Sequence, residues 1–304
     1  MFNHIVSKAL SSLIEHIDGA YAPNTIRAYK SDMEEFIRYC ARENCCALPA
    51  EPAVIARFLQ QTLSQNIKSA TISRKVSSIS AIHRLSCLND PTKHPQMKIT
   101  LRKIFRQLGR RFDQAFPITR PILEKMLAVC SKDLHGLRDK ALLLLAYDSM
   151  CRRSELIALR VEDMGIVSQN QMCILLRKSK ADQQGSGKFI HLSRETIKSV
   201  EDWLAAAKIT SGFILRGIKP NGVVTGSLCD SRIGRIYKTL ATRAQLSEKI
   251  VQSISGHSMR VGGAQDLLTQ GASLPQIMVK GGWVKPDTVM RYVERVRGQA
   301  HMNM

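Results

Sequence analysis

The segment FDQAFPITRP, residues 112–121, divides the chain into two parts whose hydrophobic patterns differ. Its two prolines remove backbone N–H donors and interrupt any helix that would run through it. Apolar residues recur at helical spacing before this segment, whereas helical and strand-like patterns both occur after it. A chain of 304 residues is long enough for two domains that each bury a core. We therefore predict one domain over residues 1–113 and a second over residues 114–304.

The first part of the chain is predicted to be a bundle of helices. Within residues 24–42, apolar side chains recur every three or four positions, which places them on one face of a helix. Three more amphipathic stretches follow, and breaks that contain proline or polar residues separate them. These stretches are EPAVIARFLQQTLSQ, SATISRKVSSISAIHRLSCL and MKITLRKIFRQLGRRF.

Basic side chains accumulate on the later helices of this bundle. They are Arg74, Lys75, Arg84, Lys98, Arg102, Lys103, Arg106, Arg110 and Arg111. Such a series can face the phosphates of a nucleic acid, or it can form an ordinary solvated surface. The formal net charge of +20 and the pI near 9.9 favour the nucleic acid. The excess is +8 over residues 1–115 and +12 over the remainder, so both parts can attract a polyanion.

Composition gives less support to other partners and chemistries. No run of about 18 apolar residues predicts a membrane span, and residues 1–17 lack the apolar core of a signal peptide. The eight cysteines show neither CxxC pairs nor a histidine at zinc-finger spacing, which is typical of reduced, buried thiols. We therefore expect a cytoplasmic protein without a membrane partner, a metal site or a cofactor.

The second part combines helical patterns with one pair of strands. Two short apolar runs, QMCILLRK and KFIHLS, flank the polar, glycine-containing SKADQQGSG, which predicts a β-hairpin. The predicted helices are ILEKMLAVC, LRDKALLLLAYDSM, SELIALRVEDM, ETIKSVEDWLAAAKI, DSRIGRIYKTLATRAQL, MRVGGAQDLLTQG and PDTVMRYVERV. The expected fold class is mainly α, with an α+β second domain that contains a small antiparallel sheet.

Three segments of the second part contain the groups that metal-free phosphoryl chemistry needs. The sequence shows no acidic cluster at metal-binding spacing, no H-E-x-x-H pair and no P-loop. Phosphoryl transfer then requires cations to hold the charged oxygens, groups that move protons, and a nucleophile in line with the leaving oxygen. The segments SMCRRSELIALRVEDM, GHSMRVGGA and GGWVKPDTVMRYVERV supply such groups.

These three segments resemble the tyrosine recombinase (phage integrase) family. The first resembles the box in which an arginine precedes an (S/A)-E-(L/I) helix start, and alignment on the S-E-L triplet selects Arg152. The second matches an H-x-x-R box at His257 and Arg260. The third places Trp283, where a histidine is more usual, ahead of Tyr292. The resemblance covers the whole C-terminal domain and is nearest to the Cre-like members of the family.

The resemblance implies a catalytic role for each of these residues. Arg152 and Arg260 would donate from their guanidinium forks to the non-bridging phosphate oxygens. His257 precedes Arg260 by three positions, so both side chains can approach one phosphate from the same helix face. Tyr292 would be the nucleophile that forms a phosphotyrosyl bond. Trp283 would donate its indole N–H to the phosphate or simply wall the site.

Two further assignments follow from the resemblance, and one residue stays without a role. The family places a lysine general acid on the hairpin, which indicates Lys180, although Lys178 or Lys188 could substitute. Glu155 would orient neighbouring groups rather than transfer protons. Arg153 stands where relatives usually show an apolar residue, and its role is open.

Membership of this family would make the protein a site-specific DNA recombinase that needs neither metal nor ATP. Its partner would be double-stranded DNA with an inverted-repeat target site, gripped by a core-binding first domain and a catalytic second domain. The free protein would be a monomer or dimer, and a homotetramer would form on DNA. It would be nucleoid-associated and bacterial or phage-encoded. The alternatives are a topoisomerase or telomere resolvase with the same chemistry, and a DNA-binding regulator without activity.

Overall fold

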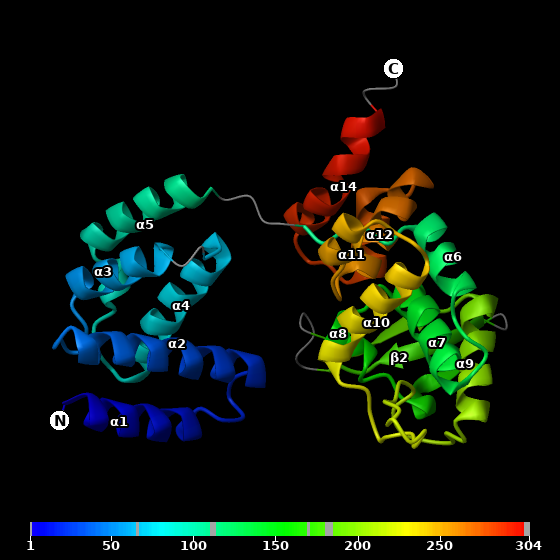
Figure 1. The fold of residues 1–304 in the computed structure, drawn as a ribbon, viewed down its shortest axis with the longest axis horizontal. Coiled ribbons are helices and arrows are strands. Elements are labelled where there is room, and N and C mark those ends of the chain that lie inside the picture. The colour runs from blue at the N-terminus through cyan, green and yellow to red at the C-terminus, as the bar shows by residue number, and fades with distance from the viewer. Residues whose placement is uncertain (1, 65–66, 110–113, 169–170, 180–184, 301–304) are drawn as a thin grey trace. The chain divides into compact units, whose positions relative to one another are not determined.

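The chain forms two compact units in the computed structural model, Met1–Asp113 and Gln114–Met304 (Figure 1). The structure describes residues 2–64, 67–109, 114–168, 171–179 and 185–300. Each unit buries a hydrophobic core of its own. The predicted fold class is confirmed, because helices dominate both units and the second unit adds an antiparallel sheet.

The first unit is a helical bundle that follows the predicted amphipathic stretches. Its elements are α1 (Phe2–His16), α2 (Pro23–Arg42), α3 (Pro52–Leu63), α4 (Ser69–Leu85), the 3-10 helix η1 (Pro91–Lys93) and α5 (Pro95–Leu108). Prolines stand in the first turns of α2, α3 and α5, where a missing N–H costs no helical hydrogen bond. Phe36 and Phe58 lie 5.1 Å apart between ring centroids, and this contact packs α2 against α3.

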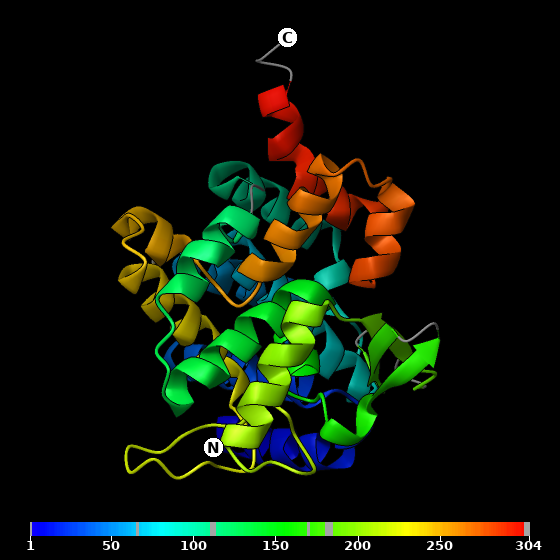
Figure 2. The ribbon, with the colours of Figure 1, turned by 90° about the vertical axis from the view of Figure 1, so that its right-hand side faces the viewer.

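The second unit is built around α7, a helix that is buried on almost all sides. Helix α9 lies alongside α7, and the sheet lies beside this pair (Figure 2). The helices are α6 (Arg120–Ala128), α7 (Leu134–Ser149), α8 (Arg153–Leu156), the 3-10 helix η2 (Val161–Asp163), α9 (Arg194–Ala206), α10 (Asp230–Arg243), α11 (Glu248–Ser253), α12 (Ser258–Thr269), α13 (Leu274–Gly281) and α14 (Pro286–Ala300). Of these, α11 and α13 were missing from the sequence prediction.

The sheet has the antiparallel order β1-β2-β3, with β1 at Met164–Ser168, β2 at Gln171–Leu176 and β3 at Lys188–His191. The predicted hairpin is confirmed, since β2 pairs with β3 and Ile174 lies opposite Ile190. This pairing places the two hairpin strands against the core of the second unit.

The prediction of one helix over SELIALRVEDM was wrong. Helix α8 ends at Leu156 because the backbone groups that follow pair with a distant loop. The Leu159 carbonyl accepts from Ile214 N at 3.0 Å, and Val161 N donates to the Gly212 carbonyl at 2.9 Å. These bonds turn the chain into β1, which the sequence prediction did not contain.

Two adjacent glycines of α12 differ in what they tolerate. A Cβ at Gly262 would lie 1.9 Å from the backbone oxygen of Ile118, whereas a Cβ at Gly263 would lie 3.3 Å from the flexible Met150 side chain. We expect Gly262→Ala to lower the free energy of unfolding by about 3 kcal/mol, because the backbone must shift. We expect Gly263→Ala to change it by less than about 1 kcal/mol, since better helix propensity offsets the contact. Unfolding of both variants in guanidinium chloride tests this difference in packing. Equal unfolding midpoints for the two variants would contradict it.

Candidate active site

Arg152 lies at the N-cap of α8, where Glu155 fixes its direction. The backbone N–H of Arg152 donates to one Glu155 carboxylate oxygen at 2.8 Å, and its Nη1 donates to the other at 2.7 Å. Glu155 is buried, so a single carboxylate orients both the backbone and the guanidinium of Arg152.

Arg260 lies on α12 and is only 3% exposed. Its Nη1 donates to the carbonyl of Met150, a residue whose φ of 50° ends α7 in the left-handed region. Its Cζ lies 4.2 Å from the ring centroid of Trp283, which is a cation–π contact. Burial and the charge of Arg152 lower the pKa of Arg260 to about 10, so the guanidinium stays charged at neutral pH. Among the described residues, its buried Nη2 has no hydrogen-bond partner.

Trp283 connects Arg260 to Tyr292. The rings of Trp283 and Tyr292 meet edge to face, with centroids 5.7 Å apart and an angle of 61° between planes. A Cβ at Gly281 would lie 2.0 Å from Trp283 Cζ3, so the end of α13 accommodates the indole only because this residue is glycine. The backbone carbonyl of Tyr292 accepts from Gln265 Nε2 at 2.8 Å, which ties α14 to α12.

His257 occupies the N-cap of α12 and is exposed. Desolvation lowers the pKa of its imidazole, and the charges of Arg153, Arg260 and Arg152 lower it further. The imidazole is therefore neutral at neutral pH in the free protein. A neutral imidazole can accept a proton or donate a hydrogen bond from its N–H.

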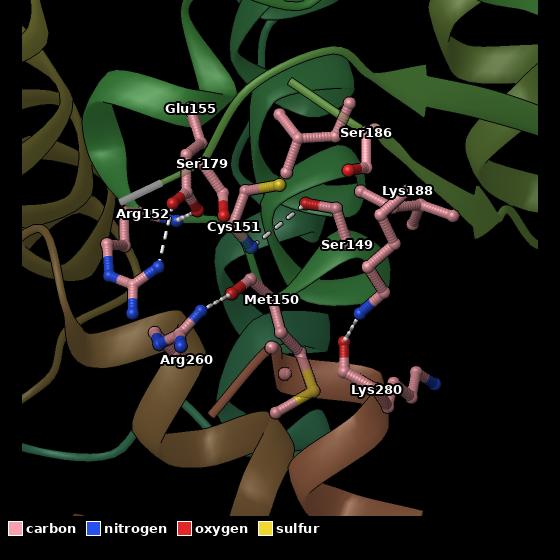
Figure 3. Close-up of a pocket in the computed structure, with 15 residues that line it drawn as sticks. Ser149, Met150, Cys151, Arg152, Glu155, Ser179, Ser186, Lys188, Arg260 and Lys280 are labelled. Carbon is pink, nitrogen blue, oxygen red and sulfur yellow. Dashed lines mark hydrogen bonds and ion pairs between the residues drawn. The ribbon is translucent and has the colours of Figure 1, made fainter. Parts of the chain in front are cut away.

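A cavity of about 380 Å³ opens beside the two arginines (Figure 3). Arg152, Glu155 and Arg260 line it at one end, and Lys188 lines it across from them. His257, Trp283 and Tyr292 are not among its lining residues. Trp283 contacts Arg260 and Tyr292 contacts Trp283, while His257 lies one helical turn before Arg260 and is affected by its charge. The structure therefore connects these three residues to Arg260 rather than gathering them inside one cavity.

The three hairpin lysines differ in their exposure and contacts, and one of them lies outside the described residues. Lys180 lies outside the described residues, and Lys178 is exposed. Lys188 begins β3, and its Nζ donates to the carbonyls of Val279 at 2.5 Å and Lys280 at 2.9 Å. Desolvation lowers the pKa of Lys188, and the charges of Arg260 and Lys280 act in the same direction. Sequence reasoning named Lys188 only as an alternative, because its contact with the end of α13 cannot be read from spacing.

The predicted DNA-binding residues of the first unit fall into four groups. Arg84, Lys98, Arg102, Lys103 and Arg106 are exposed. Arg74 donates to buried Asp32 at 2.8 Å but keeps 46% of its side chain exposed. The prediction for Lys75 was wrong. Its side chain is buried, the residue being 2% exposed, and its ammonium is paired with Glu35, so it cannot face a phosphate. Arg110 and Arg111 lie outside the described residues.

The described part of the chain has neither a metal-binding cluster nor a membrane-spanning helix. It contains no group of three or more His, Cys, Asp or Glu side chains that could hold a metal ion. Its helices include none that is both long and apolar enough to cross a membrane.

Comparison with known proteins identifies the family. A model of the phage integrase family matches residues 117–297, and a model of the phage integrase N-terminal SAM-like domain matches residues 14–86. The chain therefore belongs to the phage integrase family of tyrosine recombinases, enzymes that carry out site-specific recombination, as its motifs predicted.

Relatives match along both units. An "Integrase/recombinase xerD homolog" of Selenomonas ruminantium is 29% identical over 92% of this chain and 84% of that protein. "Recombinase cre" of Escherichia phage P1 is 25% identical over 91% of this chain and 85% of that protein.

Solved structures share the fold at low sequence identity. XerH recombinase bound to a palindromic difH substrate, in a post-cleavage complex, has a TM-score of 0.69 at 16% identity, covering 97% of this chain and 84% of that chain. The Tn1549 transposon integrase in complex with transposon right end DNA has a TM-score of 0.66 at 16% identity, covering 98% and 99%. At this identity they show the fold alone.

Proposed function

We propose that this recombinase cleaves and rejoins DNA through a covalent bond between Tyr292 and a 3′ phosphate. The observation that carries the proposal is the series of contacts from Arg260 to Trp283 and from Trp283 to Tyr292. Through Trp283 it links the Tyr292 ring to a buried, charged guanidinium whose Nη2 has no hydrogen-bond partner among the described residues. A negative charge on Tyr292 would raise the pKa of Arg260, which agrees with this arrangement.

In the proposed reaction the Tyr292 oxygen attacks the phosphorus and the bond from phosphorus to the 5′ oxygen breaks. The guanidinium groups of Arg152 and Arg260 stabilise the charge that develops on the non-bridging oxygens. The imidazole of His257 accepts the phenol proton, and the leaving 5′ oxygen takes a proton from a lysine. Attack by a 5′ hydroxyl on the phosphotyrosine reverses these steps, so the bond energy is conserved without ATP.

We assign the lysine general acid to Lys180, with Lys188 as the alternative. The assignment to Lys180 rests on the family pattern of the hairpin. Lys188 lines the cavity opposite the arginines, and its lowered pKa makes it a better proton donor than an ordinary lysine. Two carbonyls of α13 hold Lys188 in the described state, so it would have to leave them in order to reach a leaving group.

We further propose that the target is an inverted repeat and that four protomers assemble on two such sites. Each protomer would bind one arm of the repeat, cleave one strand, and take part in a Holliday junction that the second pair of strands resolves. The free protein would be a monomer or dimer. The palindromic substrate of XerH supports an inverted-repeat target, and the lambda integrase dimer on a COC′ core site supports two protomers on one site.

Covalent capture tests the proposed reaction. The protein is incubated with fragmented DNA from its source in excess EDTA, denatured, and the protein-linked fragments are sequenced. We expect fragments that end at an inverted repeat. A parallel reaction contains Mg²⁺ in place of EDTA. Binding without any adduct in both reactions would favour a DNA-binding regulator, and adducts that form only with Mg²⁺ would overturn the metal-free mechanism.

The buried position of Lys75 gives a test of the DNA-binding surface. We expect Arg102→Ala to weaken binding to a random-sequence duplex and to reduce the slope of log affinity against log salt by about 0.9, the value for one phosphate contact. Lys75→Met is the matched change and should leave this slope unaltered, because the ammonium already pairs with Glu35. Fluorescence anisotropy at several salt concentrations measures both slopes. An equal loss of slope in the two variants would show that Lys75 also reaches DNA.

A further inference from the structure

Arg153 is a third arginine at the candidate active site, and the proposed reaction does not use it. It is the first residue of α8 and is half-buried. A Cβ at Gly256 would lie 2.0 Å from Arg153 Cδ, 2.7 Å from Cγ and 2.8 Å from Nε. The stem of Arg153 therefore runs directly over the Gly256 backbone, which only glycine leaves open. Because Gly256 precedes His257, this packing holds the Arg153 side chain against the residue next to His257.

The charge of Arg153 is not balanced by the described part of the chain. Arg152 pairs with Glu155, whereas the guanidinium of Arg153 makes no hydrogen bond or ion pair with any described residue. Among the charges that lower the pKa of His257, that of Arg153 has the largest effect, ahead of Arg260 and Arg152. Three guanidinium groups thus act on one imidazole, and the described residues provide a carboxylate partner to only one of the three.

Neither packing of the side-chain stem nor solvation of the charge explains why an arginine stands at position 153. An apolar side chain at position 153 would pack over Gly256 as well as the arginine stem does. A purely solvated arginine would gain by turning away from two like charges, yet Arg153 is held against the residue next to His257. Such a concentration of positive charge is stabilised when an anion binds between the cations.

We propose that Arg153 is a third phosphate-binding guanidinium, which binds a DNA phosphate together with His257. The identity of this phosphate as DNA rests on the proposed function. The contact with Gly256 fixes the Arg153 stem next to His257, and the Arg153 charge acts on the His257 imidazole. In this role Arg153 adds a charge-assisted hydrogen bond to the phosphate and leaves the chemistry to Tyr292.

Inorganic phosphate serves as the probe, so the test needs no target DNA. Protein labelled with carbon-13 in histidine is titrated with phosphate at constant ionic strength, and the NMR signal of the His257 ring is followed. The variant His257→Gln assigns that signal. Arg153→Met keeps an apolar stem without the charge, and Arg153→Lys keeps the charge without the fork. Arg194→Met is the matched control, because Arg194 is also the first residue of a helix but is exposed on α9.

We expect the unmodified protein and Arg194→Met to respond at the same phosphate concentration. Arg153→Met should need at least about tenfold more phosphate, and Arg153→Lys an intermediate amount. The inference is overturned if the His257 signal does not change with phosphate, or if it changes in Arg153→Met at the same phosphate concentration as in the unmodified protein. Should Arg153→Met fail to fold, as judged by thermal unfolding, Arg153→Lys decides by the same criterion. If the His257 signal responds to phosphate only when Arg153 is present but no DNA adducts form, the phosphate site stands and the recombination mechanism is rejected. If DNA adducts form but the His257 response does not depend on Arg153, this inference alone is rejected.

Discussion

Replacing Tyr292 with phenylalanine is expected to abolish covalent attachment to DNA and to leave duplex binding intact. The phenylalanine ring keeps the edge-to-face contact with Trp283, whose centroid lies 5.7 Å away, so the variant loses the oxygen and little else. We expect attachment to fall at least about 1,000-fold, because no other group can form the phosphotyrosyl bond. Denaturing gels of end-labelled DNA measure attachment, and anisotropy measures binding.

Tyr237→Phe is the control for this substitution. Tyr237 lies in the same unit on α10, is 1% exposed, and belongs to a different hydrophobic cluster from Trp283 and Tyr292. The Tyr237→Phe variant should retain full covalent attachment to DNA. Covalent adducts formed by Tyr292→Phe at the normal rate would mean that another residue is the nucleophile.

Replacing Arg260 with lysine is expected to slow cleavage at least about 100-fold while binding is unchanged. The guanidinium donates to the Met150 carbonyl, stacks over Trp283, and still has Nη2 available among the described residues. A lysine ammonium is a point charge on a flexible stem, so it cannot make these contacts and also hold a phosphate. Loss of one preorganised donor to developing charge typically costs about 100-fold to 1,000-fold in rate.

Loss of stability is the competing explanation for a slow Arg260→Lys enzyme. Guanidinium chloride unfolding separates the two effects, because a folded variant with slow cleavage has lost a catalytic contact. Arg291→Lys is the matched control, since Arg291 is exposed on the helix that carries Tyr292. Normal cleavage by Arg260→Lys would contradict the role assigned to the buried guanidinium.

The apolar face of α2 made this helix predictable from the sequence. Helix α2 was expected over residues 24–42 and spans Pro23–Arg42. The end of α8 was not predictable, because it depends on two hydrogen bonds with a distant loop, in which the Leu159 carbonyl accepts from Ile214 N and Val161 N donates to the Gly212 carbonyl. Pairing between distant segments leaves no local pattern, and β1 was missed for the same reason.

The position of Lys75 could have been read from the sequence. It follows Ile72 by three residues and precedes Ile79 by four, and both isoleucines are fully buried. The same helical spacing places Lys75 on the core side, where Glu35 of α2 compensates its charge. Counting basic residues without their helical phase caused the error.

The motifs predicted the residue types of the candidate site but not its geometry. The spacing of His257 and Arg260 suggested a shared helix face, yet His257 is exposed at the N-cap while Arg260 is buried. The stacking of Arg260 on Trp283 depends on how α13 packs against α12. The contact of Arg153 with Gly256 likewise joins elements far apart in the sequence.

The most direct test of the proposed mechanism is the identity of the residue that becomes bonded to DNA. Adducts trapped in excess EDTA are digested with protease and nuclease, and the nucleotide-bearing peptide is sequenced by mass spectrometry. The mechanism predicts a single modified residue, Tyr292, joined to a 3′ nucleotide. A nucleotide on any other residue, or one joined through its 5′ phosphate, would contradict it.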